Sequence, residues 1–306
     1  MRTQLTKSIG GLLLAGLLSL PTLVQAQPSA HYVPGVEGIK GASLPPPGFW
    51  LRDYNAFYYA DTLNNPNGSK NNAVDAKAFI YANVPRLLWI TDTKVLGGYL
   101  GLDALVPIPY TDLNIKAGPN TVIDHSTLGI GDLFVEGTWS RHLKQFDLAL
   151  GYGVWAPTGD SSDQPLQAPS TLAGQGYWTH MLTAGATWYI DNDKKWAVSA
   201  LNRYEFSMEK EQTEQTPGQA YTLEWGASYG VTKTVDVGAA GYYQQQVNPT
   251  SGSAWSDRNR VAAVGPEISA FFPKWMLGLS LRYAYEFMAE NRLQGHTVAL
   301  TVTKKF

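Results

Sequence analysis

The residues of this chain best suited to chemistry are five histidines, and the chemistry they suggest is hydrolysis by a serine–histidine pair. The histidines are His31, His125, His142, His180 and His296. A catalytic base must lie within hydrogen-bond reach of its nucleophile, and only His180 and His296 lie near suitable ends of predicted strands. His180 shares its face with Trp178 and Leu182, and His296 has no serine at a telling spacing. We therefore predict no catalytic residues and no enzyme, with a hydrolase at the rim of the fold as the remaining enzymatic alternative.

Metal and cofactor chemistry has weaker candidates. Asp160 and Asp163 flank two serines and could offer oxygen ligands to calcium, but calcium takes about six oxygens or more. The chain has no cysteine, which excludes disulfides and thiolate metal sites. Neither a glycine-rich phosphate loop nor a metal-spaced histidine pair is present. We predict no metal site and no cofactor.

The elements that position these residues are predicted from the alternation of side chains. Between Leu277 and Phe287, large apolar residues at odd positions alternate with small or polar residues at even positions. The stretch 221–231 repeats this pattern. One face suits lipid and the other suits water, as in the strands of a transmembrane β-barrel. A soluble sandwich would not need so many exterior aromatic residues, and its edge strands would stay unpaired.

The same template predicts an all-β fold, a transmembrane antiparallel β-barrel of about 12 strands. The strands are expected near 48–60, 74–91, 94–107, 129–142, 145–157, 177–191, 195–208, 219–232, 234–247, 258–272, 275–289 and 295–306. Short connections alternate with longer polar loops, one of which covers 108–128. Tryptophans near the strand ends fit the aromatic girdles of such barrels: Trp50, Trp89, Trp139, Trp188, Trp196, Trp225 and Trp275.

The two ends of the chain agree with this fold. Arg2 and Lys7 precede an apolar stretch over 9–20 and a small-x-small site ending at Ala26, the pattern of a cleaved secretory signal peptide. The last strand ends on the aromatic Phe306, as is usual in outer-membrane barrels. We predict a signal peptide (1–26), a Pro/Gly-rich segment (27–47) and a barrel (48–306) in the bacterial outer membrane.

Charged side chains on the predicted inward faces are the candidate functional residues. We expect these to line the lumen: Arg52, Lys77, Asp103, Glu136, Arg203, Glu205, Glu224, Glu267, Arg282 and Glu286. They could bias passage against anions, with Arg203, Glu205, Arg282 and Glu286 as a constriction. Alternatively, they form a salt-bridged network that fills a small barrel, the interpretation we favour for any single pair. The aromatic residues Trp155, Phe134 and Tyr242 could form an apolar patch among them.

The segment 27–47 has two possible places. Its prolines and glycines resist both helix and regular sheet. Gly35, Gly38 and Gly41, spaced by three, would allow the backbone to approach a wall closely, as a plug inside the barrel requires. A periplasmic tail is the alternative.

The sequence also resembles a family of outer-membrane proteins named after the MetA-pathway of phenol degradation. The matching stretches are 31–41 with 44–48, Gly129-Ile-Gly-Asp132, Ala156-Pro-Thr-Gly-Asp160, Gly174-Gln-Gly-Tyr-Trp178, Val264-Gly-Pro-Glu267 and Tyr283-Ala-Tyr-Glu286. The resemblance covers nearly all of the chain after the signal peptide. It implies a barrel that transports small hydrophobic or aromatic molecules, although a shared fold does not establish a shared substrate.

Composition and resemblance together define the expected function. Charged residues make up 16% of the chain and the net charge is -2, a balance that does not suit nucleic-acid binding. We expect a passive outer-membrane channel for small hydrophobic or aromatic compounds, working as a monomer surrounded by lipid. A non-enzymatic structural or adhesive barrel is the alternative.

Overall fold

The computed structural model describes residues 30–163, 170–253 and 258–306. The predicted signal peptide and its cleavage point after Ala26 lie outside these residues. Within the described part of the chain, no helix has the length and apolar character needed to cross a membrane. The regular elements of the described residues are strands, with one short 3-10 helix, η1 (Pro273–Trp275).

The strands follow one another along the chain with few other elements between them. They are β1 (Gly48–Leu63), β2 (Val74–Val95), β3 (Gly98–Leu105), β4 (Ile108–Ala117), β5 (Asn120–Leu128), β6 (Leu133–His142), β7 (Phe146–Ala156), β8 (Thr179–Tyr189), β9 (Trp196–Ser207), β10 (Ala220–Gly230), β11 (Val235–Gln246), β12 (Arg260–Phe272), β13 (Leu277–Glu290) and β14 (Leu293–Lys305).

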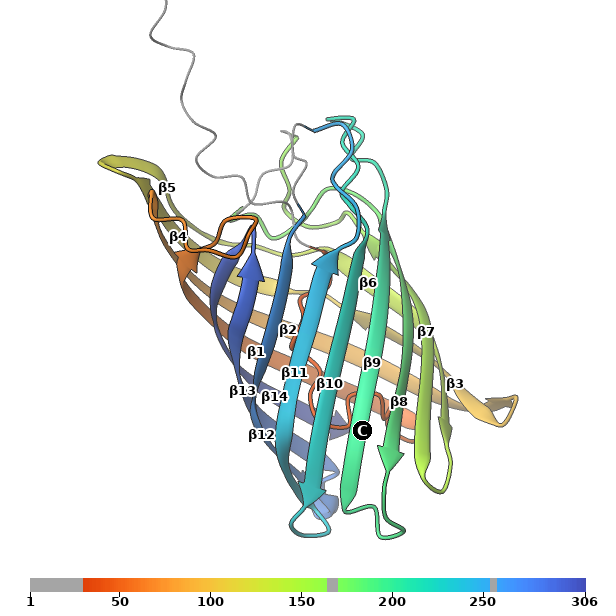
Figure 1. Ribbon diagram of the computed structural model, residues 1–306. Coiled ribbons are helices and arrows are strands. Elements are labelled where there is room, and N and C mark those ends of the chain that lie inside the picture. The colour runs from red at the N-terminus through yellow and green to blue at the C-terminus, as the bar shows by residue number, and fades with distance from the viewer. Residues whose placement is uncertain (1–29, 164–169, 254–257) are drawn as a thin grey trace, which may run out of the picture.

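Twelve of these strands close into an antiparallel barrel. Closure follows because β1 pairs with β14 along one edge and with β2 along the other, as Figure 1 shows. Neighbours around the ring follow the order of the chain, except that β3 pairs directly with β6. Pairing both edges of every strand in the ring satisfies the backbone without leaving an open edge. The predicted barrel of about twelve strands is confirmed.

The strands β4 and β5 form a hairpin that extends the wall beyond the ring. The long strand β2 pairs with β3 over Arg86–Val95 and with β4 over Val74–Asn83. Gly118, in the turn, has φ +57°, a conformation that glycine adopts without steric cost. The loop predicted over 108–128 is therefore wrong. Most side chains of β5 are exposed, so this strand lacks apolar alternation, whereas β4 has it at Leu113 and Ile115, which are buried.

Side chains of the barrel strands alternate between the lumen and the outer face. On β13, Leu281, Tyr285 and Phe287 are 50%, 45% and 57% exposed, whereas Arg282 and Glu286 between them are buried. This is the phase that the sequence predicts for this strand. Trp50 differs from its predicted place in an outer girdle, because it lies inside the barrel and its Nε1–H donates to a backbone carbonyl of the preceding segment.

The two ends of the barrel differ in their connections. At the turn end, β2–β3, β6–β7, β8–β9, β10–β11 and β12–β13 are joined by short turns or by η1. The longer connections lie at the opposite, loop end, where the β4–β5 hairpin also projects (Figure 1). The alternation of short and long connections matches the prediction except between β13 and β14, where only Asn291 and Arg292 join the strands at the loop end.

Candidate functional site in the barrel lumen

Residues 30–47 run through the inside of the barrel, from its loop end to its turn end. His31 hydrogen-bonds to Thr179, the first residue of β8, at the loop end. Further along, the Ser43 hydroxyl donates to Thr187 Oγ1 at 3.0 Å, close to the other end of β8. Figure 1 shows this stretch as the red to orange trace within the barrel. Of the plug and the tail, the contacts favour the plug, and we call residues 30–47 the lumen segment.

Carboxylates of the barrel wall hold the backbone of the lumen segment. The bonds run from the N–H of Tyr32 to Glu205 (3.0 Å), from those of Gly35 and Glu37 to Glu224 (2.8 and 3.0 Å) and from that of Ile39 to Glu267 (2.9 Å). An irregular segment has no sheet partner, so its buried N–H groups need other acceptors. The surplus of acidic residues in the lumen thus has a structural use, because these carboxylates act as the missing partners.

Arg86 on β2 is the centre of a large ion-pair network. Its guanidinium donates two hydrogen bonds of 2.9 Å to Asp103, one of 3.1 Å to Glu136 and one of 3.2 Å to Glu37. Arg52 on β1 donates to Glu37 as well, at 3.1 Å. Arg86, Asp103 and Glu136 are all buried, so salt in the solvent screens these pairs little. The network joins four barrel strands, β1, β2, β3 and β6, to the lumen segment.

Two further arginines are paired in the same way. Arg203 donates to Glu224 at 2.5 Å, and its guanidinium lies 4.0 Å from the centre of the Tyr32 ring. The Tyr32 hydroxyl donates to Glu224 at 2.6 Å. Arg282 donates to Glu267 at 3.2 Å. Each arginine therefore neutralises a carboxylate that also binds the lumen segment.

The lumen segment lies so close to the wall that glycine is required at the contacts. A Cβ on Gly38 would lie 1.8 Å from Glu267 Oε2 and 2.1 Å from Arg282 Nη1. On Gly226 of β10, a Cβ would lie 2.8 Å from the Cα of Ile39. A side chain at Gly38 would therefore displace the Glu267–Arg282 pair or the lumen segment itself, and one at Gly226 would displace the backbone of the segment. The close approach expected from the glycine spacing is present at Gly38.

The predicted lumen residues point into the barrel with one exception. Those that point inward are Arg52, Asp103, Glu136, Arg203, Glu205, Glu224, Glu267, Arg282 and Glu286. The four residues proposed as a constriction do not pair with one another. Arg203 and Arg282 bind Glu224 and Glu267, whereas Glu286 accepts the hydroxyls of Tyr58 and Tyr242, both at 3.0 Å.

Lys77 is the exception, because it lies on the outer face of β2. Its neighbours Ala76 and Ala78 are buried instead and pack against Ile115 and Leu113 of β4. Lys77 was predicted to point inward with the other charged candidates, but at this end of β2 the polar face is the outer one. The same error of phase concealed Arg86, which falls on the even-numbered, inward face of β2.

Asp132 connects the lumen segment to two loops at the loop end. Its carboxylate accepts the His31 Nε2–H at 2.8 Å and the backbone N–H groups of Gly159 and Gln175 at 2.9 and 2.8 Å. Burial alone would raise the pKa of Asp132, but the His31 contact and the two backbone donors hold this pKa below its ordinary value. Four of the stretches that carry the family resemblance therefore meet at one carboxylate.

The His31 ring is neutral in this arrangement, and its protonation should loosen the structure. Burial lowers the pKa of His31 below its ordinary 6.5, against the opposing effect of Asp132. A histidine with a lowered folded-state pKa contributes fully to stability above pH 6.5, and the contribution decreases as pH falls below that value. We expect the urea midpoint of unfolding from lipid vesicles to fall more between about pH 7.5 and 5 for the wild type than for His31→Gln. Equal pH dependence of the two proteins would contradict this assignment.

An apolar cluster lies beside the charged network. Tyr32 of the lumen segment packs with Phe134, Trp155 and Met181 of the wall, and the Phe134 and Trp155 ring centroids are 4.6 Å apart. The predicted patch of Trp155, Phe134 and Tyr242 is therefore correct for the first two residues only. Tyr242 belongs to a separate cluster formed by β11, β12 and β13. The lumen combines ion pairs with an aromatic patch.

Three other residues considered for chemistry, His180, His296 and Asp160, have structural partners. His180 bonds to the Tyr152 hydroxyl at 2.8 Å and His296 to the Tyr283 hydroxyl at 2.6 Å, both on the outer face. Asp160 accepts the backbone N–H of Ile130 at 3.1 Å. In residues 30–163, 170–253 and 258–306, no three acidic or histidine side chains are grouped in a way that could hold a metal ion.

Comparison with known proteins agrees with this architecture. A family model described as "Putative MetA-pathway of phenol degradation" matches residues 60–302. The chain belongs to this family. Among curated proteins, the comparison finds no match.

This member of the phenol-degradation family shares its fold with other outer-membrane barrels. Our chain is similar to the COG4313 outer membrane channel from Pseudomonas putida F1, with a TM-score of 0.75 and 18% identity over 87% of this chain and 98% of that one. It is also similar to the β domain of the Bordetella autotransporter BrkA (TM-score 0.52, 12% identity, 85% and 99% covered). A third similar structure is the translocator domain of the autotransporter NalP from Neisseria meningitidis. The TM-score is 0.51 and the identity 11%, over 87% of this chain and 91% of that one.

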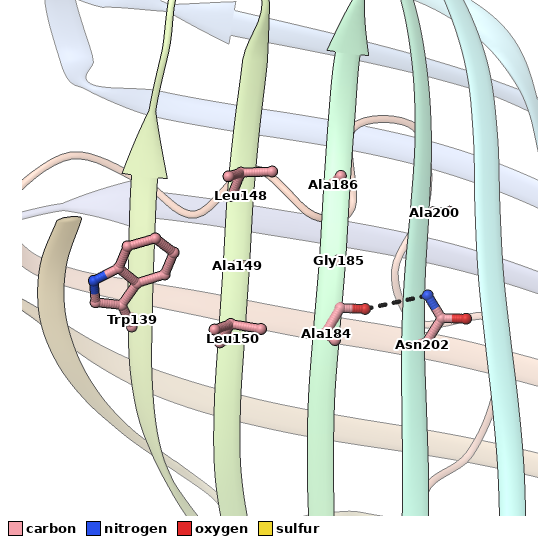
Figure 2. A pocket seen from close by; sticks show the side chains of 9 residues that line it. All are labelled: Trp139, Leu148, Ala149, Leu150, Ala184, Gly185, Ala186, Ala200 and Asn202. Atoms are coloured by element: carbon pink, nitrogen blue, oxygen red, sulfur yellow. Dashed lines mark hydrogen bonds between the residues drawn. The ribbon is translucent and has the colours of Figure 1, made fainter. Parts of the chain in front are cut away.

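The family member described here is thus an outer-membrane β-barrel. Short turns of such barrels face the periplasm and long loops face outward, so the turn end is periplasmic and the outer face of the wall contacts lipid. On this face, Trp139, Leu148, Leu150 and small residues of β8 and β9 border a shallow groove of about 370 Å³. Figure 2 shows Asn202 within it, donating a hydrogen bond of 3.3 Å to the Ala184 carbonyl.

The lipid-facing phase of β13 can be tested by substitution in this family member. Leu281 faces lipid and Ser280 faces the lumen. We expect Leu281→Arg to destabilise the folded barrel in lipid by about 2–4 kcal/mol if the position lies near the midplane, and Ser280→Arg to be tolerated. Urea unfolding in lipid vesicles measures both effects. Equal tolerance of the two substitutions would show that the phase is wrong.

Proposed function

We propose that this protein is a passive outer-membrane channel for small hydrophobic or aromatic compounds, without a catalytic step, cofactor or energy coupling. The single chain is the working unit, and membrane lipid surrounds it. The observation that carries the proposal is the aromatic cluster inside the barrel, formed by Tyr32, Phe134, Trp155 and Met181. A wall that only had to exclude solutes would not need an apolar patch in a charged lumen. Membership of the phenol-degradation family supports the same substrate class.

The state of the lumen charges is compatible with an apolar solute. Arg86, Arg203 and Arg282 each bond to carboxylates of the wall, so none offers an unpaired charge to a passing molecule. Paired charges have already lost their hydration and gain little from binding a solute. A solute that passes along the aromatic patch would therefore meet neutral surroundings.

A structural barrel is the second candidate. The observation that favours it is the dense set of bonds between the lumen segment and the wall, which includes the ion pairs of Glu37 with Arg52 and Arg86. Such a filled lumen would stiffen a barrel that conducts nothing. Transport measurements separate the two candidates.

The test is uptake of a labelled monoaromatic compound into liposomes that contain the refolded barrel, beside a sugar of similar size and empty liposomes. Faster entry of the aromatic compound alone supports the proposal. Equal entry of both indicates a general pore, and entry of neither supports the structural barrel.

A pair of variants links any uptake to the aromatic patch. Met181 is 1% exposed within the patch, and Met181→Gln introduces an amide at similar volume. We expect Met181→Gln to slow entry of the aromatic compound severalfold, because a buried unpaired amide makes the patch polar. Met181→Leu, which keeps the patch apolar, is the matched control and should retain uptake.

A further inference from the structure

A group of polar residues lies on the lipid-facing side of the wall between β1 and β2. The group consists of Asp53, Asn55, Tyr81 and Asn83, and we call it the β1–β2 polar cluster. In the antiparallel register, Asn55 is opposite Asn83, and Asp53 is opposite Pro85. Directly opposed residues share a face, so these side chains point to the same side of the sheet.

That side is the outer face. The same series of positions includes Phe49 and Phe57 on β1 and Trp89 on β2, which are 59%, 43% and 46% exposed. The alternate positions carry Arg52 and Arg86, which point into the lumen. The cluster therefore faces the membrane and not the channel.

The cluster also lies far from either water interface. Asp53 is four residues from Phe49 toward the periplasm and four from Phe57 toward the outside. At about 3.3 Å per residue, each aromatic residue is roughly 13 Å away along the strand. The strands of such barrels tilt by about 35–45° and the apolar band is about 25 Å tall, so Asp53 lies about 10 Å in height from each of these aromatic residues, within the middle part of the band. Polar and ionisable groups at this depth are costly and usually serve a function.

The hydrogen bonds inside the cluster leave acceptor capacity on the Asp53 carboxylate. Asp53 accepts from Asn83 at 2.8 Å and from Asn55 at 3.0 Å, and Asn55 accepts from Tyr81 at 2.8 Å and from Asn83 at 3.3 Å. A carboxylate can accept about four hydrogen bonds, and no cation is among these partners. The cluster thus presents spare acceptor capacity on a carboxylate in lipid.

A second polar residue on the lipid face shows the contrast. Asn202 accepts the Tyr221 hydroxyl at 2.7 Å and donates to the Ala184 carbonyl at 3.3 Å. Its carbonyl and its amide group are both engaged by neighbouring strands, so it ties the sheet together. Asp53 instead lies between apolar neighbours, Pro85 on β2 and Val302 on β14.

We propose that the β1–β2 polar cluster binds the hydroxyl group of a membrane-dissolved phenol-like molecule. The hydroxyl donates to the Asp53 carboxylate and keeps its proton, while the ring lies in the lipid against Pro85, the residue opposite Asp53 on β2. The free acceptor capacity of the Asp53 carboxylate favours a ligand with a hydrogen-bond donor. The position of the cluster in the lipid favours a ligand whose remaining part is apolar. The choice of a phenol over other apolar molecules with a donor rests on the proposed function.

The site can be located with a spin label, because the chain has no cysteine and a single introduced one is labelled cleanly. Val302→Cys places a nitroxide opposite Asp53, and Val198→Cys places one at a lipid-facing position on β9, 44% exposed in the native chain. The probe is 4-fluorophenol in nanodiscs that contain the full barrel, observed by fluorine NMR. We expect stronger broadening of its signal by the label at 302 than by the label at 198. Toluene fluorinated at the same position lacks the hydroxyl and should be broadened equally by both.

Substitutions then test the carboxylate itself. Asp53→Leu should weaken fluorophenol binding about tenfold, the usual effect of losing one hydrogen bond to a charged group, and Asn202→Leu should leave binding unchanged. Asp53→Asn keeps the size of the side chain and should also weaken binding, which covers the case that Asp53→Leu does not fold. Equal broadening at both labels, or full binding by folded Asp53 variants, would overturn the site.

Failure of this site and failure of the channel give different results. Vesicle uptake of fluorophenol and fluorotoluene is measured with the same proteins. Selective broadening by the label at 302 without uptake of either compound would support the proposed site and contradict the proposed channel function. Uptake of both compounds without selective broadening would support the channel function and contradict the proposed site.

Discussion

A variant that lacks residues 27–47 is expected to conduct ions severalfold better than the intact barrel. In the native structure the lumen segment occupies the interior from one end to the other and bonds to Glu205, Glu224 and Glu267 of the wall. The ladder of the twelve strands does not include this segment, so the barrel should still form. Without the segment, water can enter and hydrate the wall charges. Single-channel recording in planar bilayers measures the change.

A point variant provides an independent way to displace the lumen segment. A side chain at Gly38 would collide with Glu267 and Arg282, so Gly38→Leu should raise conductance in the same direction as the deletion. The matched control is Gly278→Ala, where the nearest atom to an added Cβ would be 3.6 Å away, an ordinary contact distance. Conductance unchanged by both the deletion and Gly38→Leu would mean that the segment does not limit the path.

The barrel is predictable from sequence because lipid imposes a strong pattern on the strands that cross it. On β13 the exposed aromatic residues alternate with small or charged residues, and that phase is the one predicted. The pattern is weaker in the β4–β5 hairpin, which projects beyond the ring. Strand β5 is exposed on both of its faces, so its sequence indicates a loop. The phase of β2 was misassigned at Lys77, where this strand pairs with the hairpin.

The contents of the lumen are less predictable, because they depend on contacts between residues far apart in the chain. His31 and Thr179 are 148 positions apart, and Tyr32 and Glu224 are 192 positions apart. No local pattern shows whether a Pro/Gly-rich segment enters a barrel or hangs outside it. The β1–β2 polar cluster is a similar case, since a rule that assigns polar residues to the lumen places Asp53 and Asn83 on the wrong face.

Replacing Arg86 by methionine is expected to destabilise the barrel by about 3–5 kcal/mol, the usual cost of removing one partner from a buried ion pair. The substitution keeps a long apolar side chain but leaves Asp103, Glu136 and Glu37 without their shared cation. All three carboxylates lie within 3.2 Å of the Arg86 guanidinium, and Asp103 and Glu136 would repel each other once it is gone. The free energy of unfolding in urea, measured in lipid vesicles, gives the effect.

Two further variants show whether this loss comes from the uncompensated charges. Arg260 pairs with Glu290, but its side chain is 45% exposed, so Arg260→Met should cost no more than about 1 kcal/mol. Adding Asp103→Leu to Arg86→Met removes one of the stranded carboxylates and should recover part of the stability, a coupling that the double-mutant cycle measures. A network that only fills space would instead lose more stability with each deletion. Recovery in the double variant would show that Arg86 holds three acidic groups together in a lumen where each of them alone is unfavourable.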